Sequence, residues 1–420
     1  MSDIHTHRID SGMTLITQRI GGVRSAGLSL LIPVGSASDP TDRLGRAAMW
    51  SELLFRGAAG LDSKQQADAF DAIGATRGVD AGSRFMTIAA TTTGDQMLGA
   101  MSLISDMVQN PAMEGDSIDP VRRLCIQAIE SLRDDPQQRA IYAARNRHHP
   151  EPLNRTGLGT SEGLEALDRD SLAGDWAEQT GSAHAILSIG GAIEPEMVRA
   201  EAERLFGSWK GGTPVAESGG TPPRGFGHEP DESNQVQIVL VHDGPRAGDP
   251  DSVLERVVSS VLSGGMSGRL FTEVREKRAL CYAVSSSYHA DRDSGTTTAY
   301  VGTTPERAQE SLDVLASELE RINTPAGRLT QEEFDRAIVG LKSRLVFAGE
   351  STSARTAAAA GDLFKLGKPR TLDERAAEID AVTLEQVNEY LAQRELGRVT
   401  IQTLGPSELK PPAAVPAAVG

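Results

Sequence analysis

Histidine, cysteine and aromatic residues are all scarce in this chain of 420 residues. The two cysteines, Cys125 and Cys281, are too few for a disulfide framework and do not form a C-x-x-C pair. We expect both to be reduced, buried thiols. Aromatic residues make up 4% of the chain, too few for the stacking surfaces that bind single-stranded nucleic acid. No apolar run approaches the roughly 18 residues of a transmembrane helix.

Positive charge is also in short supply. Lysine and arginine total 42 against 58 acidic residues, which gives a formal net charge of −16. This balance argues against a nucleic-acid-binding protein and leaves room only for a local basic patch. The opening sequence MSDIHTHRID is polar and has no apolar signal-peptide core. We therefore expect a cytoplasmic protein that has neither a nucleic acid nor a membrane as its partner.

One change of composition divides the chain. Residues 211–234 are rich in Gly, Pro, Ser and acids and lack hydrophobic periodicity, which predicts a linker. It would separate a first α+β domain at residues 1–210 from a second at 235–408. The remaining segment, 409–420, contains PPAAVPAAVG and is predicted to be disordered.

The two halves share an order of predicted elements, each beginning with strands and continuing through a helix, a further strand and a long amphipathic helix. In the first half these are 14–20, 26–33, 44–55, 85–93 and 96–109, and in the second 235–242, 252–278, 281–288 and 305–322. This order predicts an α+β layer structure used twice.

Complete catalytic motifs are missing from the sequence. The eight histidines stand at 5, 7, 148, 149, 184, 228, 242 and 289, and no two are three or four residues apart. No helix can therefore present two of them to zinc from one face. His148 and His149 are adjacent and point in different directions. H-x-x-E-H, H-E-x-x-H, Gly-x-Ser-x-Gly and phosphate-loop motifs are all absent.

The segment 262–288, LSGGMSGRLFTEVREKRALCYAVSSSY, carries the most information. A helix is predicted to end near Arg278, and Arg275 and Tyr282 flank the turn into the following strand. A guanidinium and a phenol placed there can converge on one carbonyl or oxyanion. Alternatively, Arg275 pairs with an acid on its own helix and Tyr282 packs in the sheet. Spacing alone favours this structural alternative.

With three other segments, this stretch resembles the insulinase/pitrilysin family of metallopeptidases, whose zinc motif is H-x-x-E-H. The second-half signature of that family is a Gly-rich helix followed by R-x-x-x-x-x-x-Y. LGRAAMWSELLFRG resembles the family segment G-x-A-H-x-x-E-H-x-x-F-x-G, and IESLRDDPQQRA and HAILSIGGAIEPEMV resemble two later family segments. The resemblance extends from about Ile9 to Thr403.

The zinc motif itself departs from the family pattern. The two ligand histidines fall at Ala48 and Glu52, and the catalytic glutamate falls at Ser51. The third ligand falls near Ala128, or at Gln127. Alanine has no lone pair for zinc, and serine cannot replace the carboxylate that activates the metal-bound water. We therefore expect a purely structural helix and no metal or other cofactor in this chain.

The family pair Arg275 and Tyr282 is present, as in the subunit of two-subunit members that assists a zinc site on the other subunit. The resemblance implies two α/β-roll domains that form half of a clamshell, and a heterodimer with a zinc-bearing paralogous subunit that hydrolyses peptides. Arg275 and Tyr282 would act in trans on the partner's site. Three alternatives remain: a structural core-type subunit, a peptide-binding chamber without chemistry, and a peptidase with a relocated metal site.

Overall fold

The computed structural model describes residues 3–413, which form two compact units built from interleaved segments of the chain. Unit 1 extends to Ser131 and takes in Glu151–Gly219 and Ala348–Thr371; unit 2 takes in Leu132–Pro150, Gly220–Phe347 and the chain from Leu372 onward. The predicted contiguous domains 1–210 and 235–408 therefore differ from the units, because a segment of each half belongs to the other unit.

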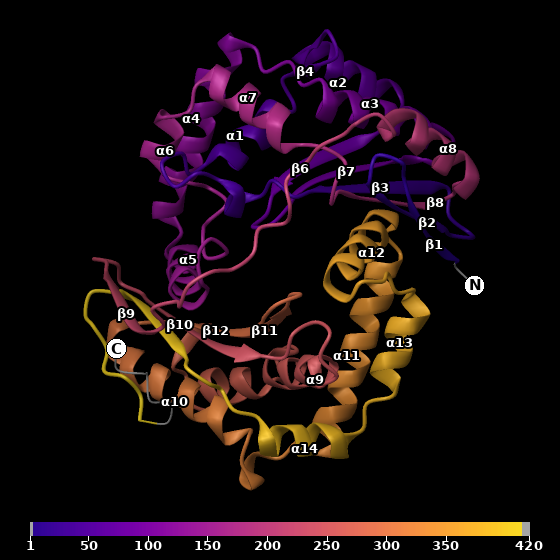
Figure 1. Ribbon diagram of the computed structural model, residues 1–420. Coiled ribbons are helices and arrows are strands. Elements are labelled where there is room, and N and C mark those ends of the chain that lie inside the picture. The colour runs from indigo at the N-terminus through magenta and orange to yellow at the C-terminus, as the bar shows by residue number, and fades with distance from the viewer. Residues whose placement is uncertain (1–2, 414–420) are drawn as a thin grey trace. The chain divides into compact units, whose positions relative to one another are not determined.

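Unit 1 is a six-stranded sheet with helices on both faces (Figure 1). In sheet order its strands are β1 (Ile4–Arg8), β2 (Thr14–Arg19), β8 (Ile186–Gly191), β3 (Ser25–Ile32), β7 (Met86–Thr93) and β6 (Thr76–Ala81). Its helices are α1 (Arg46–Leu53), α2 (Ser63–Ala72), α3 (Met97–Gln109), α4 (Gly115–Ser131), α6 (Ser161–Glu165), α7 (Arg169–Gln179), α8 (Pro195–Phe206) and α12 (Thr352–Leu366), with a short hairpin of β4 (Gly57–Ala58) and β5 (Leu61–Asp62).

The sheet of unit 1 buries apolar side chains on both faces. Leu28 of β3 and Trp50 of α1 belong to the main core on one face, whereas Ala359 of α12 is buried on the other. Helix α12 approaches β3 very closely: a Cβ added to Gly27 would stand 2.8 Å from the backbone nitrogen of Ser353. A glycine at this position therefore allows the helix to dock (Figure 1).

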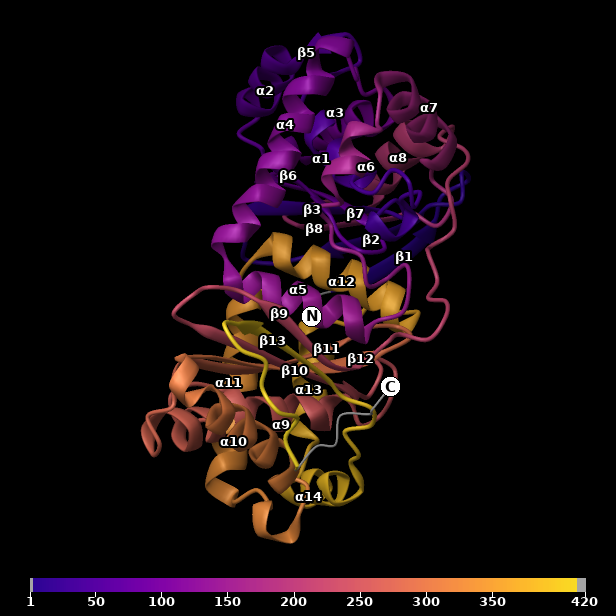
Figure 2. The ribbon, with the colours of Figure 1, turned by 90° about the vertical axis from the view of Figure 1, so that its left-hand side faces the viewer.

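Unit 2 is a five-stranded sheet with its own helices (Figure 2). In sheet order the strands are β11 (Cys281–Ala290), β12 (Gly295–Thr303), β10 (Val236–Gly244), β13 (Thr400–Gly405) and β9 (Gly225–Pro230). The helices are α5 (Pro136–His148), α9 (Ser252–Ser263), α10 (Ala308–Arg321), α13 (Leu372–Asp380) and α14 (Leu384–Gln393), and α11 (Gln331–Gly349) runs from this unit to the boundary with unit 1.

The two units repeat one topology. The order β2-β8-β3-β7-β6 in unit 1 corresponds to β9-β13-β10-β12-β11 in unit 2, and in each set the first two strands are parallel and the other neighbours antiparallel. The exchanged helices also occupy equivalent places, since α12 packs on β3 and β8 while α5 packs on β10 and β13. The predicted α+β fold class is confirmed.

Two details of the sequence prediction are wrong, and a third is tested over only part of its residues. Part of the predicted linker, Gly225–Pro230, is strand β9, which pairs in parallel with β13 despite its Gly-rich composition. The predicted helix 252–278 ends at Ser263, because Gly265 adopts a φ of +137°, and a π-helical turn follows at Phe271–Glu276. In the predicted disordered tail, the Lys410 N–H donates to the Gln309 side chain at 2.8 Å, whereas residues 414–420 lie outside the described part.

The cysteines behave as predicted. Cys125 and Cys281 are both free and buried. Within residues 3–413, no helix is both long enough and apolar enough to cross a membrane.

Candidate functional site

A buried charge network holds the N-terminus of α1, the helix that carries Ala48, Ser51 and Glu52. The Asp39 carboxylate accepts the backbone N–H groups of Gly45 and Ala47 at 2.9 and 3.0 Å. Burial raises the pKa of Asp39 to about 6, against the opposing effect of these hydrogen bonds and of Arg46. Arg46 is itself fully buried and donates to Asp175 at 2.8 Å. The start of α1 is therefore fixed by residues that are not zinc ligands.

The α1 positions that the resemblance aligns with the zinc motif take no part in the hydrogen bonds of this network. Ala48, Ser51 and Glu52 are half-buried, and the Ser51 hydroxyl donates to the Ala48 carbonyl at 2.7 Å. Glu52 lies near Cys125 of the neighbouring helix α4: burial first, and then the charge of Glu52, raise the pKa of this thiol to about 11. Ala128, one helical turn along α4, is exposed.

These side chains do not fit a zinc ion. Zinc requires nitrogen, sulfur or carboxylate ligands, usually three or four of them. Ala48 and Ala128 offer no donor atom and the Ser51 hydroxyl bonds its own helix, so Glu52 is the one carboxylate among the four positions. Across the described chain, no three His, Cys, Asp or Glu side chains are grouped so that they could hold a metal.

Arg275 and Tyr282 lie close together in the chain, at the start of edge strand β11. Arg275 belongs to the π-helical turn, is exposed, and places its guanidinium carbon 4.8 Å from the ring centre of Phe271. Tyr282 is 69% exposed. The register of β11 against β12 shifts between Cys281 and Ala283, so Tyr282 stands at a bulge. Bulges redirect side chains, and this one accompanies a phenol directed into solvent.

The structural alternative for this pair does not describe what is observed. Glu273, an acid on the same π-helical turn as Arg275, pairs instead with Lys277 at 2.7 Å and Arg278 at 2.8 Å. Among residues 3–413, neither the Arg275 guanidinium nor the Tyr282 hydroxyl has a hydrogen-bond partner. Both polar groups are therefore available to a ligand.

His148, which the sequence presented as a poor metal ligand, has a structural role. It is 1% exposed, with its Nδ1 3.0 Å from the Thr400 hydroxyl and its Nε2 3.3 Å from an Asp243 carboxylate oxygen. These contacts attach the end of α5 to β13 and β10 within unit 2. No local sequence signal predicts them, because the partners are far away in the chain.

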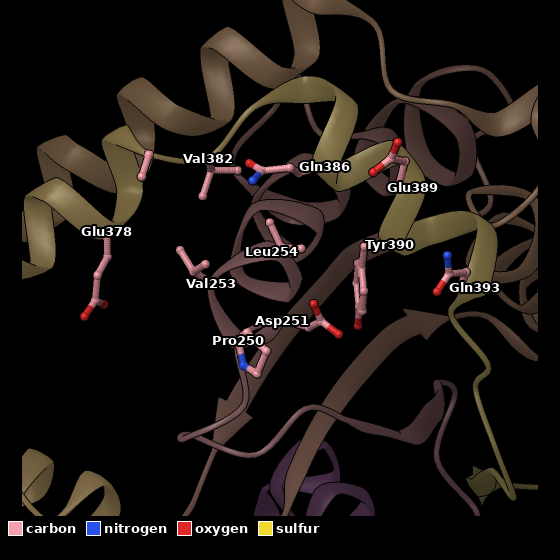
Figure 3. A pocket seen from close by; sticks show the side chains of 11 residues that line it. Pro250, Asp251, Val253, Leu254, Glu378, Val382, Gln386, Glu389, Tyr390 and Gln393 are labelled. Atoms are coloured by element: carbon pink, nitrogen blue, oxygen red, sulfur yellow. The ribbon is translucent and has the colours of Figure 1, made fainter.

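The structure also contains a hollow that the sequence did not predict. About 550 Å³ in volume, it lies in unit 2 between α9, α13 and α14 (Figure 3). Its lining combines apolar side chains such as Val253 and Leu254 with the acidic residues Asp251, Glu378 and Glu389. Neither Arg275 nor Tyr282 lines it.

Two family models match successive parts of the chain. One is described as Insulinase (Peptidase family M16) and matches residues 15–158; the other is described as Peptidase M16 inactive domain and matches residues 166–341. A protein of Rickettsia bellii (strain RML369-C) named "Uncharacterized zinc protease" is 27% identical over 413 residues, which are 97% of this chain and 98% of that protein.

Solved structures with the same fold include a peptidase M16 inactive domain from Pseudomonas fluorescens. It has a TM-score of 0.85 and 22% identity, and the match covers 98% of this chain and 99% of that one. A chain of complex III2 from Candida albicans has a TM-score of 0.80 and 17% identity, with 96% of each chain covered. At these identities the likeness concerns the fold alone.

Proposed function

The chain belongs to the insulinase (M16) family of peptidases, and on that premise we propose that it is the zinc-less subunit of a heterodimeric zinc peptidase. One observation carries the proposal. Helix α1 lacks the donors for a metal, whereas Arg275 and Tyr282 are exposed and have unoccupied polar groups. Arg275 and Tyr282 can thus assist a reaction, whereas Ala48, Ser51, Glu52 and Ala128 cannot together hold the zinc for it.

The proposed reaction is hydrolysis of a peptide bond, for which a zinc-bearing paralogue contributes the metal, the water and the general base. Tyr282 donates its hydroxyl hydrogen to the carbonyl oxygen that becomes negative in the tetrahedral intermediate. Arg275 binds a neighbouring substrate carbonyl or carboxylate through charge-assisted hydrogen bonds. The Tyr282 hydroxyl acts mainly in the transition state, whereas the Arg275 guanidinium already binds the substrate before the reaction.

The bulge at Tyr282 supports this assignment of roles. A tyrosine that only stabilised the sheet would bury its ring against neighbours, whereas this side chain is 69% exposed at a shifted register. The position of Arg275 over the ring of Phe271 restricts the guanidinium while leaving its N–H groups free to donate.

The test is Tyr282→Phe in this chain, combined with unmodified zinc-bearing partner. We expect kcat/KM of the complex to fall by roughly 10²–10³, because one oxyanion donor is lost while the ring stays. Arg275→Ala should also raise KM, and Arg275→Lys should recover only part of the loss, since an ammonium cannot reproduce the planar fork. Tyr142→Phe, an equal change on α5 of the same unit, is the matched control and should keep wild-type kinetics. Wild-type kinetics from intact Tyr282→Phe and Arg275→Ala complexes would remove the catalytic role.

Assembly is tested separately. Light scattering of the two purified chains should show a 1:1 complex in the micromolar range, and two non-interacting species would contradict the heterodimer. The second candidate is a structural subunit, favoured by the fold shared with a chain of complex III2. A scaffold predicts a stable complex that is insensitive to Tyr282→Phe, so the kinetic experiment separates the two functions.

A further inference from the structure

Strand β1 carries two histidines at the spacing that places them on one face. His5 and His7 are two residues apart in a strand whose side chains alternate between faces, so both imidazoles project to the same side. Their ring centres are 6.4 Å apart and the ring planes differ by 34°. β1 is the edge strand of its sheet; His5 is exposed and His7 half-buried.

The pairing with β2 identifies that face. His5 is opposite Thr17 and His7 opposite Leu15, and directly opposed residues of antiparallel strands project to the same side. Leu15 belongs to the main core of unit 1, whereas Ile4, on the alternate face of β1, packs in the cluster that contains α12 residues. The imidazoles therefore continue the core face of the sheet to its open edge, where they meet solvent.

A second observation points to a ligand at the same place. Thr17, opposite His5, is 0% exposed, and its hydroxyl has no hydrogen-bond partner within the described residues. Buried hydroxyls normally have a partner, and Thr17 carries one of five in the described residues that lack one. An imidazole that binds a metal through one nitrogen usually donates the N–H of the other to an acceptor. The free hydroxyl on the same face as His5 is an oxygen of that kind.

We propose that His5 and His7 form a binding site for a divalent transition-metal ion, with Cu(II) the most strongly bound. Imidazole nitrogen suits copper, nickel and zinc, whereas calcium and magnesium require oxygen ligands, and affinities across the first-row series peak at Cu(II). Each imidazole must place one nitrogen about 2 Å from the shared ion. Rotation of the exposed His5 side chain achieves this without moving the backbone, and water completes the coordination.

This site differs in kind from the zinc site of the family. It lies on a strand at the edge of unit 1, has two protein ligands, and includes none of the α1 or α4 positions. No other histidines in the sequence are two residues apart. His148 and His149 are adjacent, and both ring nitrogens of His148 already face protein groups.

The test is titration of the full chain with Cu(II), followed by calorimetry and electron paramagnetic resonance. We expect one tightly bound ion per chain, with hyperfine coupling to two imidazole nitrogens. His5→Gln and His7→Gln should each weaken binding by at least about tenfold, and Thr17→Val should weaken it by a smaller factor, since its hydroxyl acts through His5.

A matched control exchanges two neighbouring residues. Thr6→His combined with His7→Thr keeps composition, charge and two histidines, but places the imidazoles on opposite faces of β1. Its affinity should fall to that of the single variants while circular dichroism remains unchanged. Equal affinity and an equal spectrum for the exchanged chain, or no Cu(II) binding by the wild type, would overturn the proposal. Neither result bears on Arg275 and Tyr282, whose test is kinetic.

Discussion

A buried ion pair in unit 2 allows a quantitative test of its packing. Glu255 of α9 is 0% exposed and accepts hydrogen bonds from Arg394 Nη2 and Nε at 2.7 and 2.8 Å. It also accepts from the hydroxyls of Tyr390 at 2.7 Å and Thr297 at 3.0 Å. Arg394 Nη2 stands 3.2 Å from His242 Nε2. The pair thus joins α9, the end of α14 and two strands of the sheet.

Arg394→Met removes the guanidinium and keeps most of the apolar stem. Burial alone would raise the pKa of Glu255, but Arg394 and the other donors outweigh it, so the pKa of this carboxyl is lowered. Without Arg394 the carboxylate keeps two hydroxyl donors and no counter-charge. Leaving one member of a buried pair uncompensated costs about 3–5 kcal/mol, and we expect unit 2 to lose this much unfolding free energy at neutral pH.

A second substitution, Glu255→Gln, should change the unfolding free energy of unit 2 in opposite directions in two backgrounds. In the wild type, Glu255→Gln should destabilise unit 2, because it removes the counter-charge of Arg394, which is 9% exposed. In the Arg394→Met background the same change should stabilise it, because it removes an unpaired buried charge while the amide oxygen still accepts from Tyr390 or Thr297. A double-mutant cycle measures this reversal directly.

The aromatic residues provide separate signals for the two units. The three tryptophans are Trp50, Trp176 and Trp209, all in unit 1, and the five tyrosines are Tyr142, Tyr282, Tyr288, Tyr300 and Tyr390, all in unit 2. Denaturant unfolding followed by selectively excited tryptophan fluorescence and by tyrosine near-ultraviolet circular dichroism therefore resolves them. The tyrosine transition should shift more than the tryptophan transition. A loss of less than about 1 kcal/mol of unfolding free energy on Arg394→Met, as for an exposed ion pair, would refute this account. An effect of Glu255→Gln with the same sign in both backgrounds would refute it as well.

Two further predictions concern protons and metal. Burial, and then the charge of Arg394, lower the pKa of His242 to about 4. As the pH falls, the unfolded chain therefore takes up this proton before the folded chain does. Unit 2 should lose up to about 3 kcal/mol of unfolding free energy between pH 6.5 and pH 4. Asp39 should affect unit 1 in the opposite direction: its raised pKa makes the folded state bind the proton first, so unit 1 gains unfolding free energy as the pH falls. The two pH dependences are measured as denaturation midpoints, by tyrosine for unit 2 and by tryptophan for unit 1. His242→Gln and Asp39→Asn are the controls. Elemental analysis of the chain with His5 and His7 replaced by glutamine should find no stoichiometric zinc, and chelator-sensitive peptidase activity of this chain alone would contradict the interpretation of α1.

Five strands of the two sheets were predicted from the sequence, because their side-chain pattern is local. The predicted strands 26–33 and 85–93 agree with β3 and β7 to within one residue. The exchange of α5 and α12 was not predictable in the same way. An amphipathic pattern indicates that a helix buries one face, but it does not indicate which of two equivalent sheets that face covers. Strand β9 was missed because its glycines read as linker residues, although pairing with β13 orders them.

The candidate sites also differ in how much of each can be predicted from the sequence. Arg275 and Tyr282 were identified from a helix-to-strand turn, and the structure adds the π-helical turn and the bulge that leave both side chains exposed. Helical spacing identifies no histidine pair in this sequence, whereas the strand period of two identifies His5 and His7. The free hydroxyl of Thr17 beside them follows from the register of β1 on β2, which only the structure provides.

The burial of helix α1 does not depend on the positions that the resemblance aligns with the zinc motif. The side chains that bury α1 are Ala47, Met49, Trp50 and Leu53, together with Arg46, whereas the ligand positions fall on the half-buried side. Substitutions at Ala48, Ser51 and Glu52 therefore need not create a cavity in the core. Arg275 and Tyr282, in contrast to the buried side chains of α1, contribute little to the core. Their exposed polar groups bury little surface and bond no other part of the described chain, so folding does not require them. The role that we propose for Arg275 and Tyr282 is therefore toward another molecule and not in stability.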